Sequence, residues 1–284
     1  MQKLRAGNED MHLFSCGSGD PILFLHGIPT SCQLWNGVVE RMAGKYHCIA
    51  VDLPGLGQTA KRDHRFGELK HLVEAIESLR KKRGIEKWHV VGHDAGCAIA
   101  VHYAHHYQER VSRMVLMTPS IFPELEPFFL FEILRKPVLG EVMAPVINTI
   151  FWKLVMRRAF EHTPELDAAV RNFHAPFSGL TGSWRLMSLL RWGNPAQVLA
   201  SVPSLLPELL VPTLIMHGSK DPAVPVSFAQ RAAQLLPNAE KVLLDCGHFL
   251  PMSEPGLISE KLLHFFDCGK IPSSSEEPIA AVAS

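Results

Sequence analysis

Short apolar runs alternate with longer segments of helical periodicity over most of this chain. The apolar runs have the length and composition of buried strands and cover residues 22–25, 48–51, 88–91, 111–117, 213–216 and 241–244. The helix-like segments lie between them and cover roughly residues 34–43, 66–83, 95–107, 227–236 and 255–266. Strands that alternate with helices are typical of a parallel sheet with crossover helices on its faces. The pattern therefore predicts the α/β class, with a mostly parallel central sheet flanked by helices.

The alternation stops between about residues 121 and 211, where several helix-like pieces occur and no convincing strand. This stretch is rich in Phe and Trp, so we predict a helical cap (residues 121–211) inserted into a core formed by residues 1–120 and 212–270. A helical subdomain with an ordinary core of its own is the alternative, and the two are compatible. Residues 271–284 have few bulky side chains and are predicted to be a disordered tail.

Composition excludes several classes of protein. The 284 residues carry equal numbers of acidic and basic side chains, which gives no global attraction to nucleic acid. The first sixteen residues lack the apolar segment of a signal peptide, and no apolar run approaches the roughly 18 residues of a membrane span. The six scattered cysteines form no CxxC pair and are expected to be reduced thiols. We therefore expect a cytoplasmic protein without a membrane span, metal or cofactor.

The segment Gly92-His93-Asp94-Ala95-Gly96 lies between an apolar run and a helix-like segment. A tight strand-to-helix turn requires small residues two positions before and after its centre, and it projects the central side chain from the end of the sheet. The helix that follows offers free N–H groups and a positive dipole end. We therefore predict that Asp94 is a nucleophile; the alternative is that Asp94 only caps the helix.

An aspartate at this turn implies different chemistry from the serine that usually occupies it. A serine hydroxyl needs a base as it attacks, whereas an aspartate carboxylate, with an ordinary pKa of about 3.9, is already ionised at pH 7. Such a carboxylate can displace a leaving group from a saturated carbon and form an alkyl–enzyme ester. A histidine then has to activate water to hydrolyse that ester.

Two backbone N–H groups are expected to form an oxyanion hole beside Asp94. His26-Gly27-Ile28 follows a predicted strand, and in this type of fold the loop after that strand contributes one donor, here the N–H of Ile28. The N–H of Ala95, directly after the nucleophile, is the second. Both donors would stabilise the tetrahedral intermediate of ester hydrolysis.

The remaining catalytic residues are predicted at the ends of the last two strands. Asp221 follows the fifth apolar run, and His248 follows the sixth, 27 residues further on. The order nucleophile, acid, histidine is the order expected for this fold, so we predict the triad Asp94, Asp221 and His248. Asp245 is a rival acid, but it is adjacent to His248 in sequence. His102, His105 and His106 have a spacing that metal sites use, yet they lie on a helix behind the turn and are predicted to be structural.

Up to about residue 268 the chain resembles the α/β-hydrolase superfamily, and the aspartate at the turn resembles its epoxide hydrolase and haloalkane dehalogenase branches. The segment from His26 to Trp35, HGIPTSCQLW, is similar to the HGxP(TS)xxLW segment of those enzymes. The segment DLPGLG at residues 52–57 is similar to the next family loop, and Gly247-His248-Phe249 with Glu254-Pro255 to the histidine loop. The resemblance implies an α/β-hydrolase fold and a triad-type reaction.

The departures from these branches concern the leaving group. Dehalogenases of this type carry Trp after the nucleophile and often Asn after the His-Gly pair, where this chain has Ala95 and Ile28. Epoxide hydrolases carry two cap tyrosines, and the predicted cap has none. The candidate substrate or leaving-group residues are therefore side chains with a ring N–H, each with plain packing as its alternative: Trp35, Trp152, His174, Trp184 and Trp192.

The sequence predicts a hydrolase that forms an ester at Asp94 and acts on a small apolar substrate with water. An epoxide is preferred because its oxygen needs one proton donor, whereas a halide usually needs two N–H donors. Haloalkane dehalogenase is the first alternative. An ester or lactone hydrolase, a lyase acting on a β-lactone, and a non-catalytic binding protein are the others.

Overall fold

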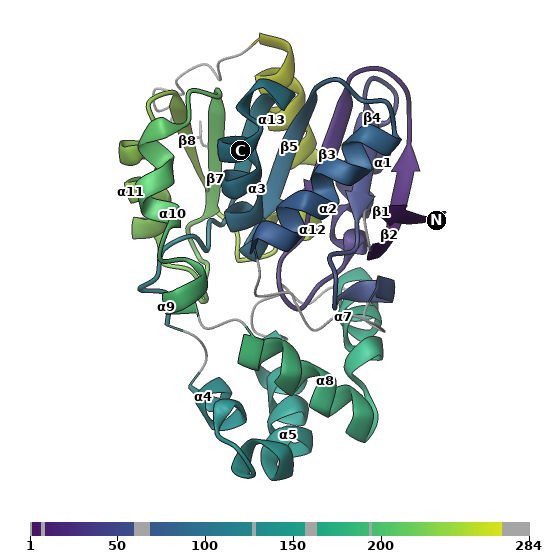
Figure 1. The fold of residues 1–284 in the computed structure, drawn as a ribbon, viewed down its shortest axis with the longest axis vertical. Helices are drawn as coiled ribbons and strands as arrows, with labels where there is room; N and C mark the ends of the chain where they lie inside the picture. The colour runs from purple at the N-terminus through teal and green to yellow at the C-terminus, as the bar shows by residue number, and fades with distance from the viewer. Residues whose placement is uncertain are drawn as a thin grey trace, which may run out of the picture.

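The computed structural model describes residues 2–6, 9–59, 69–126, 129–156, 164–192 and 195–268. Its centre is a sheet of eight strands in the order β1-β2-β4-β3-β5-β6-β7-β8 (Figure 1). The strands are β1 (Gln2–Ala6), β2 (Glu9–Cys16), β3 (Pro21–Leu25), β4 (His47–Val51), β5 (Trp88–His93), β6 (Val111–Met117), β7 (Thr213–Gly218) and β8 (Ala239–Leu244). Strands β3 to β8 are parallel, and β1 and β2 add an antiparallel edge. The predicted α/β fold class is confirmed.

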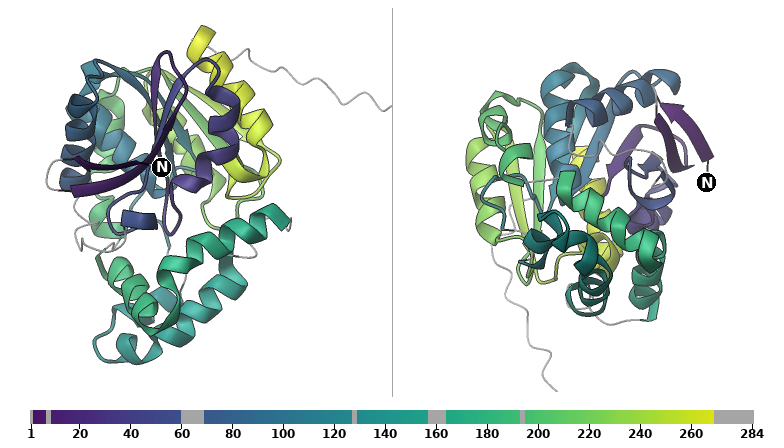
Figure 2. Two further views of the ribbon diagram at one scale, coloured as in Figure 1. Left: turned by 90° about the vertical axis from the view of Figure 1, so that its right-hand side faces the viewer. Right: turned by 60° about the horizontal axis from the view of Figure 1, so that its bottom comes forward.

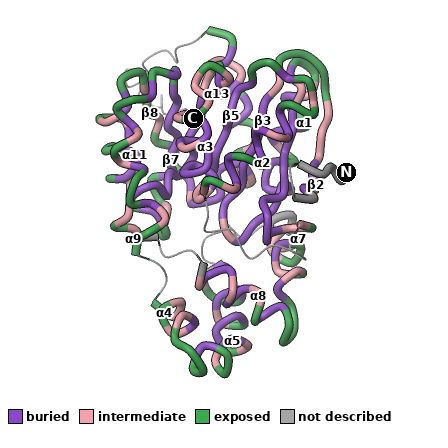
Figure 3. The backbone as a smooth tube through the Cα atoms, viewed as in Figure 1, coloured by how far each residue is buried: buried purple, intermediate pink, exposed green. Residues whose placement is uncertain are grey.

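The six predicted strands correspond to β3–β8, and the residues of β3–β7 are largely buried at the centre of the molecule (Figure 3), whereas β8 lies at the edge of the sheet and is largely not buried. Every residue of β5 is buried, because a parallel strand covered by helices on both faces has no solvent side. The sequence analysis did not predict β1 and β2. In β2 the buried Met11 and Leu13 alternate with more exposed residues, so this strand is not a continuous apolar run.

Helices cover both faces of the sheet (Figure 2). On one face α1 (Asn36–Met42) packs against α13 (Pro255–Cys268), and on the other α2 (Leu69–Lys82) packs against α3 (Ala95–His106). Helix α11 (Val226–Leu235) packs against β7 and β8. Shorter helical turns complete the core: η1 (Cys32–Trp35), η2 (Gly57–Thr59), η3 (Gln108–Arg110) and α12 (Leu250–Ser253).

A buried ion pair within α2 is hydrogen-bonded to α3. The guanidinium of Arg80 donates to both carboxylate oxygens of Glu77, at 2.9 and 2.7 Å, and the Tyr103 hydroxyl donates to Glu77 at 2.9 Å. All three side chains are almost fully buried. Burial alone raises the pKa of Glu77, but the hydrogen bonds and charge of Arg80 and the Tyr103 hydroxyl outweigh it and hold this pKa below its usual value.

The chain between β6 and β7 is helical in the described residues. It contains α4 (Leu130–Arg135), α5 (Leu139–Ile150), a π-helical turn η4 (Phe151–Met156), α7 (Pro164–His174), η5 (Ala175–Phe177), α8 (Gly179–Trp192), α9 (Pro195–Val198), α10 (Val202–Leu205) and η6 (Leu206–Glu208). We call this stretch the inserted helices. Helices α4, α5 and α8 gather at one end of the molecule, beyond the sheet (Figures 1 and 2).

The last of the inserted helices pack on the core. Helix α10 lies against α3, and Val202 and Leu206 are fully buried. Nε2 of His105 on α3 lies 2.8 Å from the Glu208 carboxylate, which gives this histidine a structural partner. The end of the inserted stretch is therefore continuous with the core.

All six cysteines are free thiols, as the sequence analysis expected. No described helix combines the length and the apolar character needed to cross a bilayer. The predicted disordered tail, residues 271–284, lies outside the described residues.

Candidate active site

Asp94 occupies a strained turn between β5 and α3. Its φ of 52° and ψ of −122° place it in a region that residues other than glycine rarely adopt. A Cβ atom on Gly92 would lie 2.7 Å from the carbonyl oxygen of Gly96, and one on Gly96 would lie 2.4 Å from that of Leu25. The turn thus requires both glycines. The Asp94 side chain makes no capping hydrogen bond to α3, which argues against a role as a helix cap.

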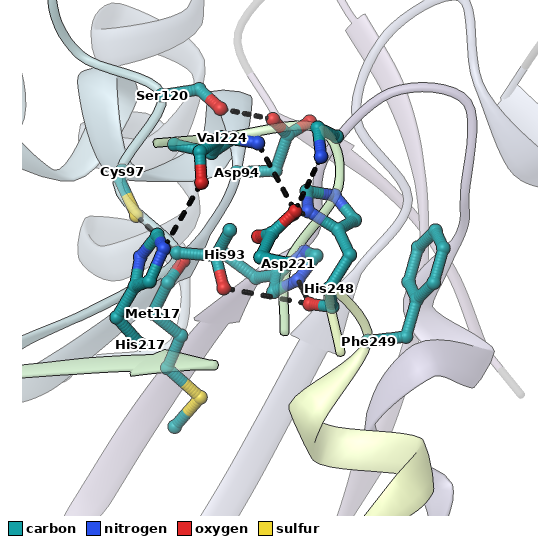
Figure 4. A network of polar contacts seen from close by, with 12 residues as sticks. His93, Asp94, Cys97, Met117, Ser120, His217, Asp221, Val224, His248 and Phe249 are labelled. Carbon is teal, nitrogen blue, oxygen red and sulfur yellow. Dashed lines mark hydrogen bonds and ion pairs between the residues drawn. The ribbon is translucent and has the colours of Figure 1, made fainter. Parts of the chain in front are cut away.

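The two carboxylate oxygens of Asp94 have different partners. Oδ2 accepts a hydrogen bond from the backbone N–H of Ile28 at 3.0 Å. Oδ1 accepts one from the hydroxyl of Ser120 (Figure 4). The carboxylate is therefore held at both oxygens.

Asp221 and His248, 27 residues apart, meet at the same end of the sheet (Figure 4). Nδ1 of His248 lies 2.9 Å from Oδ2 of Asp221, and the other oxygen of Asp221 accepts the N–H groups of Ala223 at 2.7 Å and Val224 at 3.0 Å. The backbone thus orients the carboxylate, which in turn orients the imidazole and leaves Nε2 of His248 as the proton acceptor.

The charges around this pair favour its ionised form. Burial alone lowers the pKa of His248, but the hydrogen bond and charge of Asp221, with the charge of Asp94, outweigh it and raise this pKa above its usual 6.5. For Asp221, burial raises the pKa, yet the hydrogen bond from His248 and the two backbone N–H groups hold it below its usual value. An imidazolium that forms at His248 is therefore stabilised.

The backbone of His248 is held by His93, the residue before Asp94, and by Thr118, which follows strand β6. Its carbonyl oxygen accepts hydrogen bonds from Nε2 of His93 at 2.9 Å and from the Thr118 hydroxyl at 3.4 Å. Burial and the nearby His248 lower the pKa of His93 to about 4, so His93 is a neutral donor. The position of the His248 imidazole is thus tied directly to the turn that carries Asp94.

The rival acid Asp245 points into solvent. Its side chain is 81% exposed and pairs with Lys220 at 2.9 Å. The Asp221 side chain is fully buried against His248. Of these two acids, Asp221 has the geometry of an orienting acid.

Sequence reasoning missed Ser120. This residue lies three positions after the end of β6, is 2% exposed, and reaches Asp94 because Thr118 turns the chain with a φ of 50°. The signal available in the sequence was a polar residue just beyond β6, the neighbour of strand β5 that leads to Asp94. Our prediction placed the start of the cap at residue 121 and did not consider the loop before it.

The tryptophan and histidine candidates lie in different surroundings. Trp35 is fully buried, with its ring 5.1 Å from that of Phe24 and 6.4 Å from that of His93. Trp184 is 48% exposed, and its ring N–H donates to the carbonyl oxygen of Glu141 at 3.3 Å. The side chain of Trp192 lies outside the described part of the chain.

Trp152 and His174 pack together among the inserted helices, with ring centroids 5.0 Å apart. Trp152 is 4% exposed, and within the described residues its ring N–H has no hydrogen-bond partner. Both side chains line a cavity of about 430 Å³ between η4 and α7, whose lining includes no triad residue. Ala95 is the first residue of α3, directly beside Asp94.

Within the described residues, one cluster of side chains has the composition of a metal site. It consists of His12, Cys32 and Asp52, whose potential ligand atoms lie within 4.8 Å of one another. The oxygens of Asp52 already accept the backbone N–H groups of Cys32 at 2.7 Å and Gln58 at 2.9 Å. Burial, with the nearby Asp52, raises the pKa of the Cys32 thiol far above its usual range, so the sulfur is protonated. These contacts give Asp52 a structural role in holding two loops together.

The sheet order and the residues at its strand ends define an enzyme of the α/β-hydrolase type. The sequence profile described as alpha/beta hydrolase fold matches residues 20–255, and the chain belongs to this family. Within it, the chain is a hydrolase of the α/β fold.

Individual relatives are similar to this chain at low sequence identity. The chain is 26% identical to a cis-3-alkyl-4-alkyloxetan-2-one decarboxylase of Shewanella oneidensis, over 92% of this chain and 86% of that protein. It is 23% identical to a 2-hydroxy-6-oxo-6-(2'-aminophenyl)hexa-2,4-dienoic acid hydrolase of Metapseudomonas resinovorans, over 92% and 89%. Among solved structures, a putative ancestral haloalkane dehalogenase superposes with a TM-score of 0.78 at 26% identity, covering 93% of this chain and 98% of its own.

Proposed function

We propose that this protein hydrolyses an electrophile at a saturated carbon through a covalent alkyl ester of Asp94. The observation that carries the proposal is the 3.0 Å hydrogen bond from the Ile28 N–H to Oδ2 of Asp94. An enzyme that attacks a carbonyl carbon needs this donor for the oxygen of its substrate. Here the oxygen of the nucleophile itself occupies the donor, which fits attack on a carbon that has no carbonyl oxygen to be stabilised.

In the first step Oδ1 of Asp94 attacks the carbon, and the leaving group departs with the bonding electrons. Oδ2 becomes the carbonyl oxygen of the ester and stays on the Ile28 N–H. In the second step Nε2 of His248 takes a proton from water, which attacks the carboxyl carbon of Asp94. The negative charge then develops on Oδ2, where Ile28 and, in our proposal, the N–H of Ala95 stabilise it.

An epoxide is the substrate class that we favour, with an apolar body. Opening an epoxide needs one hydrogen-bond donor at the ring oxygen. The buried ring N–H of Trp152 has no partner among the described residues, but the cavity that Trp152 lines includes none of the triad residues, so the donor is not assigned to it. The ring N–H of Trp184 already donates to Glu141. The inserted helices would act as a cap, and buried aromatic side chains such as Phe173 and Phe177 would favour an apolar substrate.

A β-lactone is the second candidate, supported by the likeness to the oxetan-2-one decarboxylase. Attack on the saturated ring carbon that bears oxygen gives the same kind of ester and releases a carboxylate, which needs no proton. The likeness to an ancestral haloalkane dehalogenase supports an alkyl halide as a third. Against a halide, Ala95 and Ile28 have no side-chain donor.

The test uses His248→Gln, which should form the ester but not hydrolyse it. The variant is incubated with a terminal alkyl epoxide, a primary bromoalkane, a β-lactone or a p-nitrophenyl alkanoate, followed by intact-mass spectrometry and peptide mapping. We expect an adduct of the full epoxide mass on Asp94, and none in the double variant Asp94→Asn/His248→Gln. A β-lactone adduct that survives brief neutral hydroxylamine is an ester rather than an anhydride.

The outcomes separate the candidate functions. An adduct from the bromoalkane or the β-lactone alone would move the function to that class while keeping the ester mechanism. Rapid turnover of the p-nitrophenyl ester by wild type, with no adduct from any other probe, would replace the proposal with acyl transfer. Binding of these probes without adduct or turnover would favour a non-catalytic protein.

A further inference from the structure

The hydroxyl of Ser120 is fixed on one oxygen of the nucleophile. Ser120 is 2% exposed, and its O–H donates to Oδ1 of Asp94 (Figure 4). Thr118 holds the preceding turn in place: its N–H donates to the Met216 carbonyl oxygen at 2.8 Å and its hydroxyl to that of His248 at 3.4 Å. The Ser120 hydroxyl is therefore placed by a buried, hydrogen-bonded loop.

The contacts of Asp94 distinguish its two oxygens before any substrate arrives. Oδ2 lies on the Ile28 N–H and would remain the carbonyl oxygen of the ester. Oδ1 would become the bridging oxygen between Asp94 and the substrate carbon. Ser120 therefore faces the atom that must leave when the ester is hydrolysed.

We infer that Ser120 is a catalytic residue of ester hydrolysis, whose O–H stabilises Oδ1 as it departs in the alcohol product. The inference rests on the proposed ester at Asp94. When the tetrahedral intermediate collapses, the bond from the carboxyl carbon to Oδ1 breaks and its electron pair goes to Oδ1. An alkoxide is far more basic than the ester oxygen that it replaces, so a donor at Oδ1 gains strength during this step.

Protons and charges balance over the step. Water loses one proton to Nε2 of His248, and the departing Oδ1 gains one, so His248 ends neutral. The second proton of water stays at first on the new Asp94 carboxyl group and is then released to solvent, which restores the carboxylate with the oxygen of water in it. For an epoxide, this released proton balances the one that the ring oxygen takes up when the ring opens. Ser120 keeps its hydroxyl overall, and its contribution is a hydrogen bond that is strongest in the transition state.

The same hydrogen bond has the opposite effect on the first step. As Oδ1 attacks the substrate it loses negative charge, so the Ser120 hydrogen bond weakens on the way to the transition state. Only interactions that strengthen in a transition state accelerate the step. Removal of the hydroxyl should therefore leave ester formation unchanged or slightly faster, while ester hydrolysis becomes slower.

The experiment measures the two steps separately in Ser120→Ala. Rapid-quench mixing with an epoxide that forms the Asp94 ester, followed by intact-mass spectrometry, gives the rate of ester formation and the rate of its loss. We expect formation within about threefold of wild type and loss slower by about 10²-fold, the order found for a lost transition-state donor. The ester should then accumulate in this variant although His248 is intact.

Two further variants control for structure. Ser120→Cys keeps a weaker donor of similar shape and should give an intermediate rate of ester loss. Ser259 on α13 is matched in burial at 2% exposed and donates to the carbonyl oxygen of Pro255 at 2.7 Å. Ser259→Ala should leave both rates unchanged.

Equal slowing of formation and loss in Ser120→Ala, or no accumulation of ester, would overturn the role of Ser120. If His248→Gln forms an ester with a probe and Ser120→Ala accumulates none with the same probe, only this inference fails. If His248→Gln forms no ester with any probe, the proposed function fails, and the inference fails with it.

Discussion

Gly27 and Asp94 lie so close that a Cβ atom on Gly27 would stand 2.3 Å from Oδ2 of Asp94. Any side chain at position 27 must therefore displace the carboxylate or the loop that carries the Ile28 N–H. We expect Gly27→Ala to lower kcat/KM by about 10²-fold or more, because the nucleophile and its donor separate. Steady-state kinetics on the substrate found by the adduct test would check this.

Gly44 provides the matched control. It is exposed, and a Cβ atom there would meet nothing within 4 Å. Gly44→Ala should leave kcat/KM unchanged and shift the free energy of unfolding by no more than about 0.5 kcal/mol. Full activity in Gly27→Ala would contradict the proposed arrangement of Asp94.

Asp221→Asn should lower kcat by about 10³- to 10⁴-fold, because the amide cannot hold the tautomer of His248 that accepts a proton at Nε2. Ester formation does not use this base, so the ester should accumulate. Asp245→Asn is the control, since Asp245 is exposed and pairs with Lys220. A larger loss in Asp245→Asn than in Asp221→Asn would reassign the orienting acid.

Ester hydrolysis should depend on pH through His248, which accepts the proton of water only when neutral. Its pKa is raised in the free enzyme, and the charge of Asp94 is one of the causes. The ester removes that charge, so the pKa of His248 in the intermediate should be lower than in the free enzyme. Ester loss should therefore slow as the pH falls through this lower value, and the ester should accumulate in acid.

Two measurements check this shift. Rates of ester loss from about pH 5 to pH 9 give the pKa in the intermediate. A histidine NMR titration, with His248→Gln for assignment, gives the pKa in the free enzyme. A rate that is constant with pH, or an intermediate pKa above that of the free enzyme, would be inconsistent with His248 acting as the base beside Asp94.

The buried pair Glu77–Arg80 within α2 predicts a change in stability without a change in chemistry. Glu77→Ala leaves the buried Arg80 guanidinium without its carboxylate, which should cost about 3–5 kcal/mol of unfolding free energy. Glu74→Ala, at an exposed position of α2, should cost less than about 0.5 kcal/mol. Urea unfolding measures both values, and equal values would show that the pair contributes nothing.

The sequence predicted the strands that contain a continuous run of apolar residues. Strands β3–β7 are largely buried, and the exposed edge strand β8 still contains the run Val242-Leu243-Leu244, so these apolar runs are recognisable without any structure. Strands β1 and β2 were missed because their apolar residues do not form a continuous run; in β2 the buried Met11 and Leu13 alternate with less buried residues. A short alternating segment resembles many loops.

The candidate site was predictable where it depends on strand ends and less so where it depends on loop paths. Asp94, Asp221 and His248 each follow a strand, and parallel strands bring such residues to one end of a sheet. Ser120 reaches Asp94 from a loop in which Thr118 adopts a positive φ, and nothing in the identity of a threonine indicates this conformation. The surroundings of Trp152 and His174 depend on how the inserted helices pack, which periodicity alone does not determine.

The unequal partners of the two Asp94 oxygens also imply that the protein would exchange an atom with its substrate in every cycle. The oxygen beside Ser120 would leave in the product alcohol, and the oxygen of a water molecule would take its place, while the oxygen on Ile28 would stay. In water labelled with heavy oxygen, the first alcohol molecule made by each enzyme molecule would be unlabelled. The label would appear first in Asp94 and only afterwards in the product. Each product molecule would therefore contain an oxygen that Asp94 took from water in the preceding cycle.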